Sequence, residues 1–184
     1  MSPFSFQRGA IATDAVLGGL PFLIMVVGLL ELARAMFVWT TLADSTRRVA
    51  RAASDGYAAT TSVNLLRGAA LFDNTGKLPI GGGIGRDNLK VDYLTSALVP
   101  VALPPCPKRN IINCNADPQG ANCVRFVRVR VCQADGADGC TPVPYAPALA
   151  PGWLLPWPVT VPSFATVRPV GSLGDVADTA DRCP

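Results

Sequence analysis

The sequence predicts an α+β protein in which a long N-terminal transmembrane helix continues into a small domain. We expect that domain to contain an antiparallel sheet, one short helix and disulfide-linked loops. Three observations support this fold class: an uncharged apolar run from Ala15 to Leu30, a helical pattern that follows it, and alternating segments among six cysteines further on. We therefore expect a helix over residues 10–55, with a membrane span at about 15–38, and a domain over 56–184.

The apolar run is slightly too short to cross a membrane by itself. As a helix, Ala15 to Leu30 is about 24 Å long, whereas the hydrocarbon layer is roughly 30 Å thick. Extending the helix through Glu31 and Arg34 to Trp39 supplies the missing length. Because Glu31 and Arg34 are three positions apart, they share a helix face and can form an ion pair. Either charge could instead pair with another helix inside the membrane.

The helical pattern continues beyond any membrane span. Apolar and small residues recur at steps of three and four, which predicts one buried stripe. Gly56 is a plausible end of this helix, and Pro21 should kink or loosen it locally. From Ala10 to Ser54 the helix would be about 65 Å long, so half of it should project from the bilayer. The stripe consists of Trp39, Leu42, Ala43, Thr46, Val49, Ala50 and Ala53.

The remaining residues predict one short helix and three strands. The short helix should cover about 62–72, with Thr61 or Ser62 as its N-cap. Alternating apolar and polar residues predict the strands, and Pro162 confines the third to an edge or a bulge. The connections between strands are rich in proline and have low helical potential. The strand candidates are Asn88–Leu94, Val124–Cys132 and Val159–Arg168.

All six cysteines follow the apolar run, which favours disulfides in an oxidising compartment over free thiols in the cytosol. Their spacing of eight or nine residues and the absence of histidine argue against a zinc site. Six cysteines allow fifteen pairings, among which Cys132–Cys140 across a hairpin and a long link from Cys183 are candidates. The full set is Cys106, Cys114, Cys123, Cys132, Cys140 and Cys183.

The composition argues against several classes of function. The net charge is +3, and no basic cluster with interleaved aromatic residues predicts a nucleic-acid partner. Without histidine, a G-x-S-x-G element or a recognisable acid pair, we expect neither an enzyme nor a cofactor or metal.

A Pro-rich stretch near the C-terminus could form a partner patch or close the domain core, and the core is favoured. Its apolar residues are Trp153, Leu154, Leu155 and Trp157.

The stretch "RGAIATDAVLGGLPFLIMVVGLLELARAMFVWTTLADSTRRVARAAS" resembles the TadE-like minor pilins, or pseudopilins, of tight-adherence (Flp) pili. The shared features are Arg-Gly-Ala, an acid five residues after the glycine, an apolar run with a proline, a Glu-x-x-Arg element and an Ala/Arg-rich helix. The later order of short helix, strand, aromatic-Pro loop and final strand is also similar. The resemblance is strong over about the first 50 residues and diffuse beyond them.

The resemblance implies processing by a prepilin peptidase between Gly9 and Ala10, with residues 1–9 as the leader. Asp14 then occupies the fifth position of the mature chain, where the family usually has glutamate, so the charge is kept on a side chain one methylene shorter. It also implies a single-pass protein of the bacterial inner membrane with its C-terminal domain in the periplasm. The implied partners are other minor pilins, the major pilin and the inner-membrane pilus assembly platform.

Asp14 has two readings in physical terms. Cleavage would leave the Ala10 ammonium at the end of an apolar helix, where such a charge is costly without a nearby carboxylate. In a bundle of staggered helices, Asp14 of one subunit could pair with Ala10 of a neighbour and fix the subunit registry. Alternatively, Asp14 simply caps the helix, since acids favour helix N-termini.

The expected function is therefore structural: a pseudopilin in the biogenesis of an Flp pilus, and so in cell adhesion, whether it initiates assembly or enters the filament. The alternative is a soluble secreted disulfide-bonded protein whose signal peptide is cleaved after Ala35. One pattern opposes the periplasmic orientation. Arg47, Arg48 and Arg51 outnumber Arg8, which by the positive-inside rule favours the opposite topology, whereas the cysteines favour a periplasmic domain.

Overall fold

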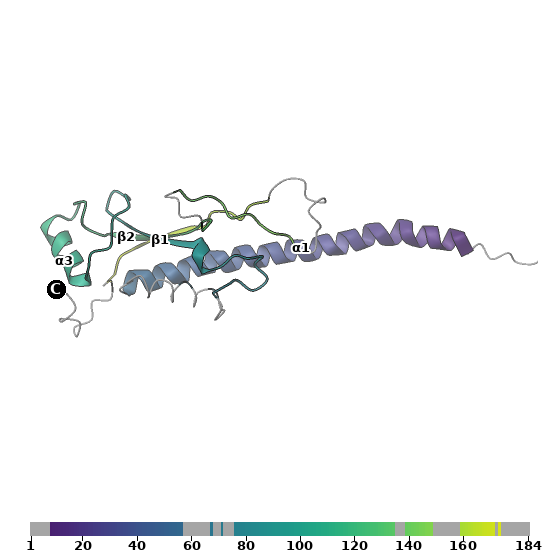
Figure 1. The fold of residues 1–184 in the computed structure, drawn as a ribbon, viewed down its shortest axis with the longest axis horizontal. Coiled ribbons are helices and arrows are strands. Elements are labelled where there is room, and N and C mark those ends of the chain that lie inside the picture. Colours follow the sequence, from purple (N-terminus) through teal and green to yellow (C-terminus); the bar gives the residue numbers. More distant parts are fainter. Residues whose placement is uncertain are drawn as a thin grey trace, which may run out of the picture.

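A computed structural model shows one long helix whose C-terminal half carries a small sheet domain (Figure 1). Helix α1, Arg8–Asp55, contains 48 residues and is about 72 Å long at 1.5 Å per residue. It passes through Pro21 without ending, and the N–H of Gly56 closes its last turn on the carbonyl of Ala52 at 2.9 Å. The structure describes residues 8–56, 67, 71, 76–134, 139–148, 159–171 and 173.

Three antiparallel strands form the sheet, in the order β1-β2-β3. They are β1, Leu89–Leu94, β2, Phe126–Val131, and β3, Ala165–Pro169. In the central strand, Val129 lies between Val91 of β1 and Thr166 of β3. The third strand begins only after Pro162, because a proline cannot donate to the ladder. Together with the long helix and the disulfides, this sheet confirms the predicted α+β class.

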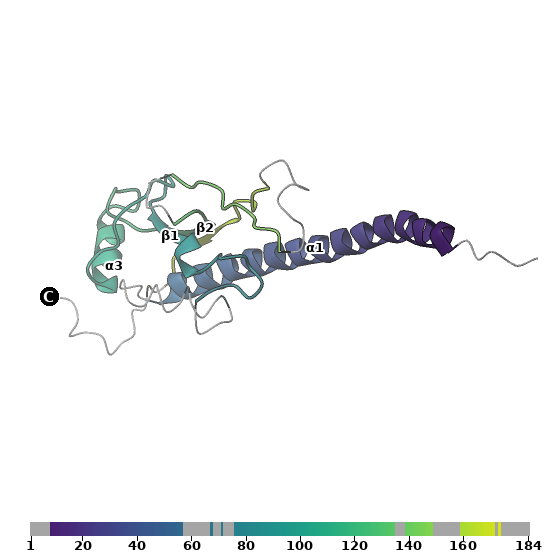
Figure 2. The same ribbon diagram turned by 45° about the vertical axis from the view of Figure 1, so that its right-hand side comes forward.

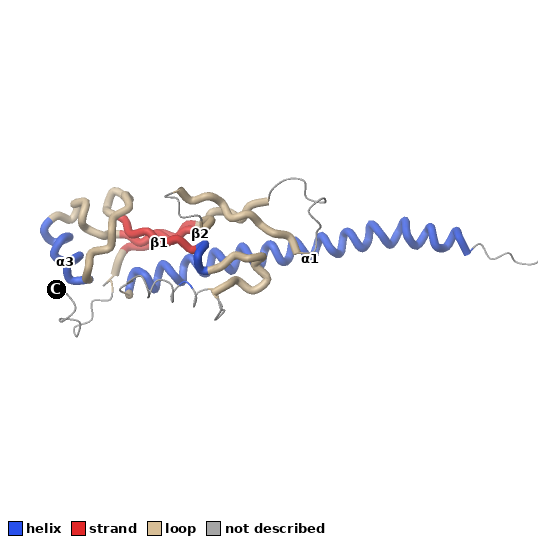
Figure 3. Tube along the Cα trace, viewed as in Figure 1, coloured by secondary structure: helices blue, strands red, loops and turns tan. Residues whose placement is uncertain are grey.

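The core lies between the sheet and the C-terminal half of α1 (Figures 1 and 3). The period of two in β2 places Val127, Val129 and Val131 on the inner face, where all three are buried. From α1, the predicted stripe supplies buried residues such as Leu42 and Val49, whereas Trp39 and Ala43 are partly exposed. Each fully buried side chain of this size contributes roughly 1.5–3 kcal/mol, so the helix and the sheet stabilise each other.

The connection between β1 and β2 corrects one expectation. Its prolines indicated low helical potential, yet α3, Pro107–Ala116, is a helix of 10 residues. Pro107 occupies its first turn, where the missing N–H costs nothing and the fixed φ favours a helix. Buried Asn110 holds α3 to the chain before β2: its side-chain amide donates to the Val124 carbonyl at 3.1 Å, and the Val124 N–H donates to its Oδ1 at 2.9 Å.

Disulfides hold the loops, as the sequence predicts. Cys114–Cys123 joins α3 to the chain before β2, and Cys132–Cys140 closes the loop after β2. Cys106 is also disulfide-bonded, whereas Cys183 lies outside the described residues. The loop before β1 includes a short 3-10 helix, η1, Arg86–Asn88.

Most of the predicted short helix at 62–72 lies outside the described residues. Within it, Arg67 is helical and Leu71 is buried. The apolar group formed by Trp153, Leu154, Leu155 and Trp157 also lies outside them.

Candidate helix–domain junction

The N-terminal part of α1 extends well beyond the domain (Figures 1 and 2). By length and composition, α1 is the one helix among the described residues that could cross a membrane. The side chains of residues 13–25 and 28–30 are all exposed, in contrast to the buried stripe further on. Its large exposed apolar side chains include Val16, Leu17, Leu20, Phe22, Leu23, Ile24, Met25, Leu29 and Leu30.

Glu31 and Arg34 lie where the exposed part of α1 reaches the domain. Their side chains form an ion pair of 2.8 Å across one helical turn and are only 10% and 9% exposed. A pair on an open helix surface would be hydrated and would contribute only a few tenths of a kcal/mol. Here both charges have lost most of their water, so each must be satisfied by other polar groups.

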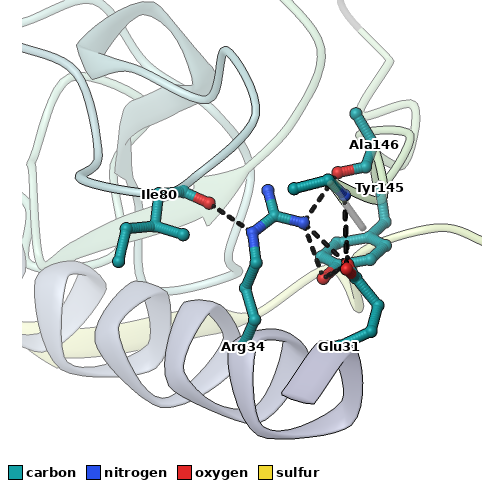
Figure 4. Close-up of polar contacts among 6 residues, drawn as sticks. Glu31, Arg34, Ile80, Tyr145 and Ala146 are labelled. Atoms are coloured by element: carbon teal, nitrogen blue, oxygen red, sulfur yellow. Dashed lines mark hydrogen bonds and ion pairs between the residues drawn. The ribbon is translucent and has the colours of Figure 1, made fainter. Parts of the chain in front are cut away.

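Arg34 binds two separate loops of the domain (Figure 4). Its Nε donates to the carbonyl of Ile80 at 2.9 Å, and its Nη1 donates to the carbonyl of Ala146 and to the Tyr145 hydroxyl oxygen, both at 3.0 Å. The guanidinium carbon also lies 5.2 Å from the centre of the Tyr145 ring, within the range of a cation–π contact. A planar, forked cation suits this arrangement of acceptors, whereas lysine has a single ammonium.

Glu31 accepts hydrogen bonds from the same loop. The Tyr145 hydroxyl donates to its Oε1 at 2.6 Å, and the Ala148 N–H lies 3.3 Å from each carboxylate oxygen. Burial and this hydrogen bond to Glu31 raise the pKa of Tyr145 to about 12. The phenol is therefore a neutral donor at every physiological pH.

The loop that contacts Arg34 from the other side has an unusual backbone. Ile80 has a φ of 60°, in the left-handed region that β-branched residues rarely adopt. Gly82 has a φ of 62°, and a Cβ added there would lie 3.2 Å from the Ala146 Cβ and 3.3 Å from Arg34 Nη2. Only glycine allows the loops before β1 and before β3 to approach each other this closely around the arginine.

The other predicted site residues lie far from this junction. Gly9 and Ala10 are in the first turns of α1, and Asp14 is exposed. Asp14 is 17 positions before Glu31, which corresponds to about 25 Å along a helix. The structure therefore brings Glu31 and Arg34 together and leaves the predicted processing and registry residues at the opposite end. Among the described residues, no group of acids and cysteines could hold a metal ion.

Tyr145 and Ile80 were missed as partners of the charged pair. The signal for Tyr145 was its place in the aromatic-Pro stretch "VPYAPALAP", the kind of loop expected to carry specific contacts. Ile80 offered no such signal, because it contributes only its backbone carbonyl.

Comparison with known proteins gives one family. Residues 9–51 match the model of the family described as TadE-like protein. No curated protein and no solved structure matches the chain. The matched segment begins at Gly9, includes Asp14, Glu31 and Arg34, and ends within the stripe that packs on the sheet, so it covers most of α1. The resemblance seen in the sequence is thus confirmed for this segment, and the chain is TadE-like over residues 9–51, which points to the context of tight-adherence pili.

Proposed function

We propose that this protein is a membrane-anchored pseudopilin, a structural and non-catalytic subunit in the biogenesis of a tight-adherence (Flp) pilus. The observation that carries the proposal is the continuity of α1. One helix combines an exposed, TadE-like apolar half with a half that is built into the core of a disulfide-linked domain. Such a helix can anchor the subunit in a membrane and later pack against other helices without unfolding the domain.

The junction indicates where the membrane span should end. Arg34 binds the loops of the domain, and Val38 is fully buried in its core, so neither is free to face lipid. The stretch Ala10–Leu30 would be about 31 Å long, which matches the hydrocarbon layer of roughly 30 Å. We therefore infer a span at 10–30, shorter at its C-terminal end than the 15–38 expected from the sequence. Glu31 would then lie at the membrane surface.

The proposed mechanism is association of helices. After cleavage between Gly9 and Ala10 by a prepilin peptidase, the new ammonium of one subunit pairs with Asp14 of a neighbour and fixes the stagger. The proposed partners are other minor pilins, the major pilin and the inner-membrane assembly platform. Because the junction fixes the domain on α1, the position of the helix determines where the domain is displayed.

The proposed orientation places the domain in the periplasm. Disulfides persist in that oxidising compartment and not in the cytoplasm, and the described cysteines are all bonded. The basic residues that oppose this orientation lie within the folded part of α1, where Arg48 is paired with Asp44 at 2.7 Å. They are part of the domain surface and not of a short loop next to the membrane, which weakens their topological signal.

Secretion of a soluble domain is less compatible with the junction. Cleavage after Ala35 would remove Glu31 and Arg34, leaving the Tyr145 hydroxyl and the carbonyl of Ile80 without these partners. Each of these hydrogen bonds contributes about 0.5–1.5 kcal/mol net, and somewhat more where a charged group takes part. An intact helix through residue 35 is therefore favoured.

A complementation experiment tests the proposal. In the native host, deletion of the protein should abolish surface Flp pili, and the unaltered chain should restore them. Asp14→Glu should also restore them, because it keeps the carboxylate, whereas Asp14→Ala should not, although both variants keep the domain intact. Normal piliation in the deletion strain would contradict the proposed function.

A further inference from the structure

Within the part of the chain that the structure describes, the outer edge of strand β3 has no partner strand. The residues on either side of β3, Phe164 and Val170, both bond toward β2. The Val131 N–H donates to the Phe164 carbonyl, and the Val170 N–H donates to the Arg125 carbonyl. Bonding alternates along an antiparallel strand, so the N–H and C=O groups of Ala165 and Val167 point the other way. Among the described residues, no backbone group bonds to them there.

This open edge lies beside α1. The hydroxyls of Thr46 and Thr166 are 2.9 Å apart, and the Gly171 N–H donates to the Ser54 carbonyl at 3.0 Å, so helix and strand run side by side. A groove of about 320 Å³ separates them at the surface. It is lined by Ala43, Thr46 and Arg47 of α1 and by residues 164–167.

The helical side of the groove carries positive charge. Ala43, Arg47 and Arg51 are spaced by four residues and therefore form one row along α1. Both arginines are exposed, and within the described residues neither guanidinium makes a hydrogen bond or an ion pair. Their neighbour Arg48 differs, because it is paired with Asp44.

We propose that the β3 edge, together with Arg47 and Arg51, is a docking site for an extended acidic segment of another pilus subunit. The segment adds to β3 as a fourth strand, with its backbone bonded to Ala165 and Val167 and its carboxylates beside the two arginines. This inference rests on the proposed function, since it names the contact by which the domain joins a partner. It assigns that contact to the sheet, separately from the packing of the N-terminal helices.

The geometry selects an extended peptide over other occupants. An alternating row of backbone donors and acceptors is complementary to a strand, whereas a helix has already used its own backbone groups. Val167 is 47% exposed on the outer face of the sheet and would contact alternate side chains of the added strand. The edge is short, and Pro169 removes one donor at its end, which limits uncontrolled self-association.

The test uses the full-length protein in nanodiscs and a fluorescent peptide of alternating glutamate and valine. Saturable binding should appear by fluorescence polarisation and should weaken with salt, whereas a matched lysine–valine peptide should not bind. Val167→Pro removes an outward N–H that the ladder with β2 does not use, so it should weaken binding by at least about tenfold. Val167→Thr keeps the N–H and should stay within about twofold of the unaltered protein.

A second pair of variants tests the charge without touching the sheet. Arg47→Glu should weaken binding of the acidic peptide by at least about tenfold, by turning attraction into repulsion at a contact. Arg109→Glu makes the same change at an exposed position of α3 that does not line the groove, and should have an effect within about twofold.

Three results would overturn the proposal: no saturable binding of the acidic peptide, equal binding of the basic one, or binding that both Val167→Pro and Arg47→Glu leave unchanged. Anionic-lipid vesicles provide a further arm. If Arg47→Glu abolished their binding while the peptide failed to bind, the groove would be a lipid site and the proposed strand addition would be wrong. Processing at Ala10 is read separately by mass, so failure of the docking site and failure of the pseudopilin assignment are distinguishable.

Discussion

Arg34 donates a hydrogen bond of 2.9 Å to the carbonyl of Ile80, 46 positions further along the chain. The same guanidinium binds Glu31 within its own helix and the carbonyl of Ala146 in a third segment. One side chain therefore holds both loops of the domain to the turn of α1 that directly follows the apolar half. This contact fixes the two loops to the helix at that turn.

Removing the guanidinium should loosen this junction. Arg34→Ala leaves buried Glu31 without its cation and two loop carbonyls without their donor, so we expect a loss of about 2–4 kcal/mol in the free energy of unfolding. The stability of Arg34→Lys should lie between that of the unaltered protein and that of Arg34→Ala, because one ammonium cannot reach all the acceptors. Thermal unfolding in detergent measures the effect, with Arg109→Ala on α3 as a control. An Arg34→Ala protein as stable as the control would show that the junction contributes little.

The Tyr145 hydroxyl should report on the junction through its ionisation. Its pKa in the folded protein is about 12, above the ordinary value of 10.0. The stability gained from the protonated phenol is therefore complete below about pH 10 and is lost as pH rises toward 12. An ultraviolet titration of the three tyrosines should show a late-ionising phenol that Tyr145→Phe abolishes. If the variant left the titration curve unchanged at its alkaline end, the hydrogen bond to Glu31 would be absent in solution.

The close approach of the two loops predicts a specific role for Gly82. Gly82→Ala combines a positive φ with a Cβ that would lie 3.2 Å from the Ala146 Cβ, so a cost of about 1–3 kcal/mol is expected. Gly83→Ala is a matched control, because its φ of 96° carries backbone strain while its Cβ would meet nothing within 4 Å. The difference between the two unfolding free energies isolates the contact between the loops. Equal losses would mean that the loops are not packed as closely as described.

The sequence predicted those parts of the fold that depend on local periodicity. The steps of three and four in α1 predicted its length and its buried residues, among them Leu42 and Val49. The period of two predicted β1 and the inner valines of β2. Helix α3 was not predicted, because the connection between β1 and β2 is rich in proline, which breaks a helix in its interior. At the first helical position, however, a proline favours a helix, and Pro107 lies there.

Only part of the candidate site could be predicted from the sequence. The spacing of Glu31 and Arg34 predicted that they could pair, but nothing local indicated that the pair would be buried. That burial depends on Tyr145 and Ile80, which are 111 and 46 positions from Arg34. Contacts of this kind arise from the path of the loops over the folded sheet, and a backbone carbonyl such as that of Ile80 leaves no trace in the residue pattern.

The central claim is that α1 is a processed pilin-type helix that remains attached to its domain. The most direct measurement is the intact mass of the protein extracted from membranes of its native host, together with mapping of its N-terminal peptide. We predict a mature chain that begins at Ala10, carries Asp14 as its fifth residue and partitions with the membrane. A soluble chain beginning at Met36 would contradict this account, because it would lack Glu31 and Arg34 and with them the junction.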